Sequence, residues 1–203
     1  KRSTYKITII SSETDYFFSR TALMYIYMGH MKFEHTKPYE DGFWKKNKID
    51  LVRDHVERVS TQSKSLILQS GKTVIYDILI IASGSTSNKF GWPGQELQGV
   101  QGLYSYQDLE KMEQGTKGIS RAVVVGGGLI GIEMAEMLVS RKIPVSMLVR
   151  EREFWSNVLP LQEANLISRH IRSHHVDLKL ETELKEIQPE ESGQVKAVVT
   201  SSG

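Results

Sequence analysis

The chain has 203 residues, of which 39% are hydrophobic, and its 26 basic and 24 acidic residues leave a net charge of +2. This near balance gives no electrostatic case for nucleic acid or an anionic membrane as a partner. The absence of cysteine excludes disulfides, thiolate metal sites and cysteine nucleophiles within this chain. No run approaches the roughly 18 apolar residues of a transmembrane span and no signal peptide is visible, so we expect a cytoplasmic protein.

The first part of the chain alternates predicted strands and helices. β-Branched residues predict a strand over residues 5–10, and a helix is expected over residues 20–28, stopping at Gly29. A second helix is expected over residues 39–47, and residues 49–52 predict the next strand.

A β-meander and a connecting segment follow. Short antiparallel strands are predicted over residues 56–60, 65–69 and 72–76. Residues 76–84, Tyr-Asp-Ile-Leu-Ile-Ile-Ala-Ser-Gly, predict a buried strand that runs into a turn of small residues. Residues 85–104 are rich in glycine and proline and therefore predict a connection, after which Ser105 can cap a helix that extends to about Gln114.

Residues 121–150 are the most informative stretch. Residues 122–125 are typical of a buried parallel strand, residues 129–141 predict an apolar helix, and residues 145–149 predict a second strand. The turn after the first strand, Gly126-Gly127-Gly128-Leu129-Ile130-Gly131, fits G-x-G-x-x-G. With strand, turn, helix and second strand all in place, the unit indicates dinucleotide binding. The alternative is a glycine-rich turn in an α/β domain that holds no ligand.

The glycines have separate physical tasks. Gly126 permits a tight turn, Gly128 lets a pyrophosphate approach the backbone, and Gly131 lets the helix pack close to the strand. The free N–H groups of the helix start, which includes Leu129 and Ile130, would then face the phosphates.

The residues that end the second strand bear on the choice of nucleotide. The ribose-binding acid expected about 20 residues after the glycines falls at Val149. Arg150 can meet a 2′-phosphate and favours NADPH, although it can also be a solvated charge. Glu151 can accept a hydrogen bond from a ribose 2′-hydroxyl and so favours NADH, as does a glycine at position 131. The sequence leaves this choice open.

After Arg150 the order of the first half repeats. A helix is predicted over residues 161–173 and a strand over residues 176–178, followed by paired strands over residues 183–188 and 195–200. Both halves therefore run strand, helix, a strand with the sequence Ile/Val-Asp-Leu, and a small meander, which predicts an internal duplication. Each copy lacks one element of the other, so we expect a piece of a longer protein, cut at both ends. His174 and His175 lie on a polar stretch, and we interpret them as surface residues, with no metal site.

Three motifs resemble the pyridine nucleotide-disulfide oxidoreductase family, whose flavoproteins have two dinucleotide-binding domains. Residues 76–85 resemble its "YD-hhhh-ATGS" flavin motif, Trp92-Pro93-Gly94 resembles "IPG", and the glycine turn with Glu133 resembles "GGGxIGxE". The resemblance covers essentially the whole chain. It implies an α/β fold with two incomplete Rossmann-like three-layer domains carrying β-meander insertions. These are an FAD-binding domain over residues 1–117 and an NAD(P)-binding domain over residues 118–203.

The resemblance also implies roles for individual residues. By matching position, Glu13 would contact the FAD ribose, Arg20 would lie near the FAD pyrophosphate or flavin, and Val56 would hold the adenine through its backbone. The flavin-side loop would contain Ala82, Ser83 and Gly84, and Glu133 would lie near the nicotinamide. The plain alternatives are a loop acid for Glu13, a helix-surface residue for Arg20, and a surface or ion-pairing residue for Glu133.

Departures from the family's motifs exclude the disulfide-reductase subgroup and favour another branch. The redox cysteine pair of the disulfide reductases would fall within residues 16–25, which contain no cysteine. That stretch is similar instead to the "YxRPPLSK" of the ferredoxin reductase and nitrite reductase-like branch. Its arginine matches Arg20, its prolines are Thr21 and Ala22, and its lysine falls at Tyr25.

The resemblance therefore implies an FAD-dependent NAD(P)H oxidoreductase that passes hydride from nicotinamide to flavin and electrons to a small-molecule or protein acceptor. No catalytic side chain is assigned, because hydride transfer between these cofactors needs no acid or base. A third domain beyond Gly203 would make a homodimer. One alternative is a non-catalytic NAD(P)-binding regulatory module. A one-domain short dehydrogenase is disfavoured, because Tyr104, Tyr106 and Lys111 do not fit Tyr-x-x-x-Lys.

Overall fold

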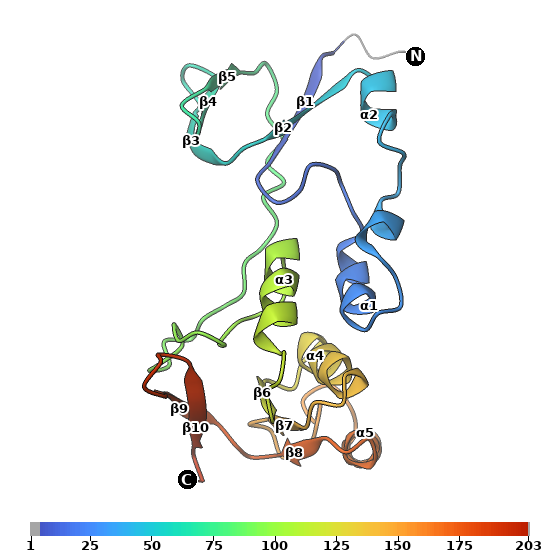
Figure 1. Cartoon of the computed structure of the whole chain (residues 1–203), viewed down its shortest axis with the longest axis vertical. Helices are drawn as coiled ribbons and strands as arrows, with labels where there is room; N and C mark the ends of the chain where they lie inside the picture. Colours follow the sequence, from blue (N-terminus) through green and yellow to red (C-terminus); the bar gives the residue numbers. More distant parts are fainter. Residues whose placement is uncertain (1–4, 203) are drawn as a thin grey trace.

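The computed structural model describes residues 5–202 as an elongated α/β chain with several small sheets (Figure 1). The strands are β1 (Ile7–Ser11), β2 (Ile49–Arg53), β3 (Val56–Ser60), β4 (Ser65–Leu68), β5 (Thr73–Ile75), β6 (Ala122–Val125), β7 (Val145–Leu148), β8 (Asp177–Lys179), β9 (Leu184–Pro189) and β10 (Val195–Thr200). The helices are α1 (Leu23–Tyr27), α2 (Phe43–Lys46), α3 (Tyr106–Gly115), α4 (Leu129–Ser140) and α5 (Leu161–Ser173), and two 3₁₀ turns are η1 (Arg20–Ala22) and η2 (Phe33–Thr36).

The glycine-rich unit forms the parallel sheet β6-β7-β8 with α4 following β6. All four residues of β7 are buried, as expected for the central strand of a parallel sheet. Three of them are apolar, and the fourth, Ser146, has hydrogen-bond partners in Arg121 and Asp177. The prediction of a buried strand over residues 122–125 is only partly correct. Val124 is buried, but Val123 and Val125 are 38% and 40% exposed, because β6 is an edge strand of this sheet in the part of the chain described.

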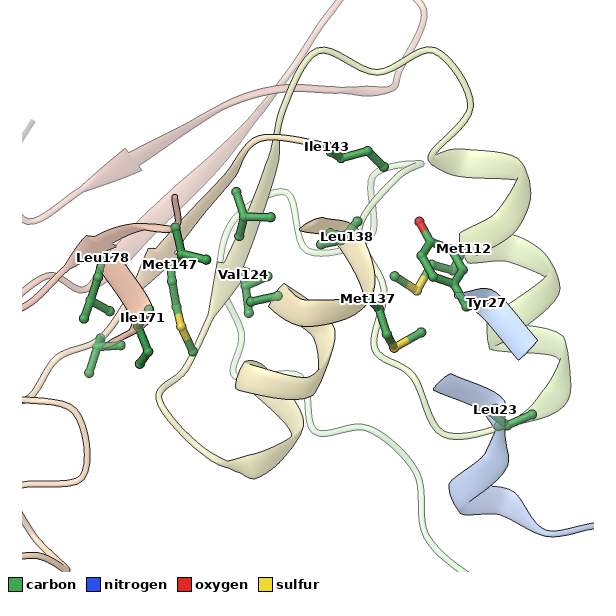
Figure 2. Close-up of a cluster of buried hydrophobic side chains, with 14 of the residues drawn as sticks. Leu23, Tyr27, Met112, Val124, Met137, Leu138, Ile143, Met147, Ile171 and Leu178 are labelled. Atoms are coloured by element: carbon green, nitrogen blue, oxygen red, sulfur yellow. The ribbon is translucent and has the colours of Figure 1, made fainter. Parts of the chain in front are cut away.

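One hydrophobic core joins this sheet to helices from both halves of the chain. Figure 2 shows Met147 and Leu178 of the sheet near Ile171 of α5, and Met137 of α4 facing the side where Tyr27 of α1 lies. Within this core Tyr27, Ala135, Met137 and Met147 are fully buried. Leu109 and Met112 of α3 belong to the same cluster. The core therefore holds α1 and α3 against α4.

The predicted duplication is visible as two equivalent parallel strand pairs. In the first half β1 pairs with β2 and Thr8 stands opposite Asp50; in the second half β7 pairs with β8 and Ser146 stands opposite Asp177. The two Asp-Leu dipeptides thus occupy the same place in both halves. The difference is burial, because Ile7 and Ile9 of β1 are 43% and 41% exposed.

The meanders form separate antiparallel sheets. In the first half β3, β4 and β5 make a three-stranded sheet, and in the second half β9 pairs with β10. A second apolar cluster of Leu148, Leu184 and Ile187 packs against Trp92, Leu97 and Val100 of the connecting segment. The Pro93 carbonyl also accepts a hydrogen bond of 2.8 Å from Ile187 N. The connection is therefore attached to β9.

The prediction of a buried strand over residues 76–84 is wrong. This stretch forms no strand, and Ile78, Ile80 and Ile81 are 71%, 84% and 72% exposed. Figure 1 shows it running as an open segment toward the lower half of the molecule. No strand among residues 5–202 pairs with it, so its apolar side chains have no surface on which to become buried.

The predicted helix over residues 39–47 is also shorter than expected. Only Phe43–Lys46 is helical, and the residues before it form turns. The Tyr39 ring stacks on Phe43 with centroids 4.0 Å apart. The helix predicted over residues 20–28 begins as the 3₁₀ turn η1 and ends before Gly29, whose φ of +80° suits glycine.

Candidate functional site

The glycine turn at the end of β6 has the geometry that its sequence predicts. Gly126 has a φ of +113°, a conformation that residues with a side chain rarely adopt. Gly128 is the extended residue that precedes α4, a helix of 12 residues. The first N–H groups of a helix have no partner within it and carry its positive dipole end. This end of α4 can therefore hold an anion.

Gly128 and Gly131 have different surroundings, and these show whether a pyrophosphate would fit at the turn. A Cβ at Gly128 would meet nothing within 4 Å, so the space above its backbone is open. A Cβ at Gly131 would lie 2.3 Å from the Gly126 carbonyl oxygen and 3.2 Å from the Met147 methyl group. One glycine thus leaves room for a ligand, and the other lets α4 approach the sheet. The residues present fit a dinucleotide.

The residues that end β7 lie beside this turn. A Cβ at Gly127 would approach a Val149 methyl to 2.9 Å, and Val149 is buried at 1% exposure. Arg150 and Glu151 follow it, and their side chains form an ion pair with Nε and Oε1 3.1 Å apart. The Arg150 side chain is exposed and that of Glu151 is largely covered. A group that can bind a 2′-phosphate, Arg150, and a group that can bind a ribose 2′-hydroxyl, Glu151, therefore both follow the end of β7.

A second group of predicted residues meets after β1. The Arg20 guanidinium donates to both carboxylate oxygens of Glu13, at 2.8 and 2.6 Å. The Tyr106 N–H donates to Glu13 Oε1 at 2.8 Å. A carboxylate has about four lone-pair positions, so one remains for a further donor such as a ribose hydroxyl. The pair therefore fits a nucleotide ribose, with Arg20 already engaged.

These contacts change the acidity of both groups. Partial burial acts to raise the pKa of Glu13, but the hydrogen bonds from Arg20 and from the Tyr106 backbone outweigh it and hold the pKa below its usual 4.5. The Glu13 carboxylate in turn raises the pKa of Arg20 above its usual range. The two side chains are consequently a charged pair at neutral pH.

The first pair is linked to the predicted flavin-side loop through Tyr104. Its carbonyl accepts from Arg20 Nη1 at 2.5 Å, and the Arg20 guanidinium carbon lies 4.3 Å from the centre of its ring. Its hydroxyl accepts from the Ser85 N–H at 2.9 Å. A Cβ at Gly84 would lie 2.4 Å from that hydroxyl oxygen. The structure thus brings together Glu13, Arg20 and Gly84, which are far apart in the sequence.

The remaining predicted residues are more dispersed. Val56 starts β3 and pairs with Leu68 in the first meander. Ala82 and Ser83 are exposed in the segment that forms no strand. Glu133 is exposed on α4, and among residues 5–202 no ion pair involves it. Leu129 and Ile130 are 63% and 64% exposed at the start of α4.

Sequence reasoning missed Tyr104 as a site residue. In the sequence Tyr104 is notable only as a tyrosine that is wrongly spaced from Lys111 for a Tyr-x-x-x-Lys pair. The available signal was the Ser105 capping box directly after it, in which Ser105 Oγ accepts from Asp108 N and Asp108 Oδ2 accepts from Ser105 N. Asp108 Oδ2 also accepts from the Tyr104 N–H at 3.1 Å, so the cap fixes the position of Tyr104.

No group of three or more His, Cys, Asp or Glu side chains within residues 5–202 is arranged to hold a metal ion, and His174 and His175 are both exposed. None of the helices in this part of the chain has the length and apolar character needed to cross a membrane.

Comparison with known proteins gives a consistent family. The sequence pattern of the pyridine nucleotide-disulphide oxidoreductase family matches residues 1–203. NADH-rubredoxin oxidoreductase of Clostridium acetobutylicum is 30% identical over 142 residues, which are 70% of this chain and 37% of that protein. Nitrite reductase [NAD(P)H] of Bacillus subtilis is 26% identical over 184 residues, which are 90% of this chain and 23% of that protein. The chain thus spans well under half the length of these relatives.

The fold is shared with a solved structure. A ferredoxin reductase from Rhodopseudomonas palustris superposes with a TM-score of 0.88 at 21% identity, covering 98% of this chain and 50% of that one. The α/β class with Rossmann-type parallel units is therefore confirmed.

Proposed function

Because the chain belongs to the pyridine nucleotide-disulphide oxidoreductase family, we propose that the complete protein is an FAD-dependent NAD(P)H oxidoreductase. It would pass hydride from nicotinamide to flavin and electrons to an acceptor. The observation that carries the proposal is the pair Gly128 and Gly131, one open to solvent and the other in contact with the backbone of β6's turn. If the turn served packing alone, position 128 would not need to be glycine, because a side chain there would meet no other residue.

In this function each half of the chain would bind one nucleotide. Residues 1–117 would bind FAD, with Glu13 at its ribose, Arg20 near its pyrophosphate or flavin, and Val56 at its adenine. Ala82, Ser83 and Gly84 would border the flavin. Residues 118–203 would bind NAD(P)H through the glycine turn, with Glu133 near the nicotinamide and Arg150 and Glu151 at the ribose.

The chemistry divides between cofactor and protein. Flavin supplies the hydride-accepting ring when bound. The tasks of this chain are binding and orientation. The N–H groups at the start of α4 would donate hydrogen bonds to the NAD(P)H pyrophosphate, and Glu13, held by Arg20, would accept a hydrogen bond from the FAD ribose. The names of two relatives indicate two kinds of acceptor, the protein rubredoxin for one and the small molecule nitrite for the other. For this protein we propose an electron-carrier protein or a small molecule, a cytoplasmic location, and a homodimer built by further sequence.

The test is an anaerobic absorption titration of the complete natural protein with NADH and, separately, with NADPH. A flavin spectrum that bleaches with one of them supports the proposal. A protein that stays colourless when supplied with FAD contradicts it. A protein that binds NAD(P)H without reducing flavin would instead support a non-catalytic regulatory module.

The same titration addresses the nucleotide preference. Arg150→Gln removes the charge that can meet a 2′-phosphate and releases Glu151 from its ion pair. We expect the ratio of the NADPH to the NADH dissociation constant to rise about 10-fold, the size of one charge-assisted hydrogen bond. Arg152→Gln, which alters a neighbouring exposed arginine paired with Glu181, is the control. An unchanged ratio would show that Arg150 is only a solvated charge.

A further inference from the structure

Tyr104 makes more connections than a residue in a connecting segment needs. Its N–H donates to Asp108 Oδ2, its carbonyl accepts from Arg20, and its hydroxyl accepts from the Ser85 N–H. Its ring lies under the Arg20 guanidinium with the carbon 4.3 Å from the ring centre. Every polar group of this residue is therefore engaged, and each partner lies in a different segment.

The partners on one side belong to the proposed ribose site. Arg20 holds Glu13 through two hydrogen bonds, and the Phe18 ring also faces the guanidinium at 5.4 Å. The chain just after Tyr104 adds to the same group, because Tyr106 N donates to the Glu13 carboxylate and Gln107 Nε2 to the Glu13 carbonyl at 2.6 Å. Movement of Glu13 would therefore be transmitted to Tyr104.

The partner on the other side is the segment that carries the proposed flavin motif. Ala82, Ser83 and Ser85 are exposed and lie outside helices and strands, so few contacts fix this backbone. The contact between Gly84 and the Tyr104 hydroxyl leaves no room for a side chain at Gly84. Gly102 makes a similar approach, because a Cβ there would lie 2.2 Å from Ser87 Oγ. Gly102 and the Tyr104 side chain are thus the contacts that support the loop.

We propose that Tyr104 is a positioning residue that couples the Glu13–Arg20 pair to the Gly84–Ser85 loop, so that FAD held at one end orders the backbone at the other. This inference rests on the proposed function. The ring supports the guanidinium by a cation–π contact, and the hydroxyl fixes the Ser85 amide. Tyr104 itself moves no proton and takes no part in the hydride step.

The experiment compares Tyr104→Phe and Tyr104→Leu in the complete protein. Phenylalanine keeps the ring under Arg20 and removes only the acceptor for Ser85; leucine removes both contacts. The control is Tyr27→Phe, which removes a hydroxyl that donates to Thr116 Oγ1 at 2.8 Å in the core, away from this group.

Three readouts separate coupling from stability. In the protein without added FAD, we expect hydrogen exchange at the Ser85 amide to be about 10-fold faster in Tyr104→Phe and unchanged in Tyr27→Phe. The FAD dissociation constant should rise about 3- to 10-fold in Tyr104→Phe and further in Tyr104→Leu. At saturating FAD the flavin absorption bands of Tyr104→Phe should be shifted, which a loss of global stability would not cause.

The possible failures are distinct. A wild-type protein that binds FAD, with a Tyr104→Phe variant that matches it in Ser85 exchange, FAD affinity and flavin spectrum, overturns the inference and leaves the proposed function standing. A wild-type protein that binds no FAD overturns the proposed function and, with it, the role of Tyr104 toward flavin. Faster Ser85 exchange together with weaker FAD binding supports the coupling.

Discussion

At the scale of single residues, Gly128 and Gly131 separate ligand binding from folding. Gly128→Ala adds a methyl group to open space at a negative φ of −88°, so the free energy of unfolding should change by no more than about 0.5 kcal/mol. Gly131→Ala forces a methyl group against the Gly126 carbonyl and should cost about 1–3 kcal/mol.

The nucleotide should distinguish these two variants further. Gly128→Ala places the methyl group where the pyrophosphate would lie, and we expect NAD(P)H affinity to fall at least about 10-fold. Chemical denaturation and nucleotide fluorescence titration measure the two quantities. Gly42→Ala, also at an open position that precedes a helix, is the control for a methyl group without a ligand. Unchanged affinity in Gly128→Ala would contradict the assignment of the site.

The Glu13–Arg20 pair makes stability depend on pH in a defined direction. The pKa of Glu13 is lower in the folded state than its usual 4.5. The ionised side chain therefore adds to the free energy of unfolding in full above pH 4.5, and this stabilisation is lost as the pH falls through the folded-state pKa. Glu13→Gln cannot lose a contribution in this way. We expect thermal unfolding below pH 4.5 to show a steeper loss of stability for the wild type than for Glu13→Gln.

The control for this pH effect is Glu57→Gln, which changes an exposed glutamate of β3. Its stability should follow the wild-type pH curve. Equal acid slopes for wild type and Glu13→Gln would show that the ion pair contributes nothing to stability.

At the scale of elements, the connecting segment is fixed by its contact with β9. Gly94 has a φ of +83°, and a Cβ there would lie 2.0 Å from the Ile187 carbonyl oxygen. Gly91 has almost the same φ, +81°, with nothing within 4 Å. Alanine at either position has to adopt the left-handed conformation, at about 1–2 kcal/mol. Gly94→Ala should cost about 1–3 kcal/mol more, because it also displaces β9.

Denaturation of the two alanine variants under identical conditions checks this difference. The Gly91→Ala variant supplies the cost of the backbone conformation alone. Equal destabilisation would mean that the connection can move away from β9 without loss.

The elements also show why sequence patterns predict some structures and not others. The helix over Leu161–Ser173 and the unit around the glycine turn follow from local periodicity and turn chemistry, and both were predicted closely. The apolar run at residues 76–84 has the same local signal as a buried strand, but a strand also needs a neighbour to pair with. Pairing is a property of distant chain, so the sequence pattern could not reveal its absence here. The same limit applies to Tyr104, whose partners Glu13, Arg20 and Ser85 are brought together only by the fold.

At the scale of the whole molecule, the two halves share a hydrophobic core and are also joined by the contacts of Arg141, which we call the Arg141 clamp. Arg141, at the end of α4, donates through Nε to the Tyr27 carbonyl at 2.7 Å, and its guanidinium carbon lies 3.7 Å from the centre of the Tyr27 ring. The same side chain reaches Glu113 of α3 at 3.0 Å. One residue of the second half thus satisfies a carbonyl at the end of α1, where the helix itself supplies no donor.

Arg141→Ala should therefore lower the free energy of unfolding by about 1–2 kcal/mol and raise hydrogen exchange in α1 more than in β7. Arg169→Ala, at an exposed position of α5, is the matched control and should stay within about 0.5 kcal/mol of the wild type. Exchange that rises equally in α1 and β7 would mean that the Arg141 clamp supports the fold as a whole and does not hold α1 specifically.

The seat of α1 on α3 and α4 has a consequence for a cut chain. Lys89 lies in an exposed stretch without helix or strand, a typical site for tryptic cleavage. A nick there leaves α1 on one fragment, and leaves α3, α4 and the residues that pack against β9 (Trp92, Leu97 and Val100) on the other. The shared core, including Leu23, Tyr27 and Met112, would still join the two fragments. The nicked protein should consequently run as one species in gel filtration and as two bands on a denaturing gel, which makes this stretch a natural place to split the protein into complementing parts.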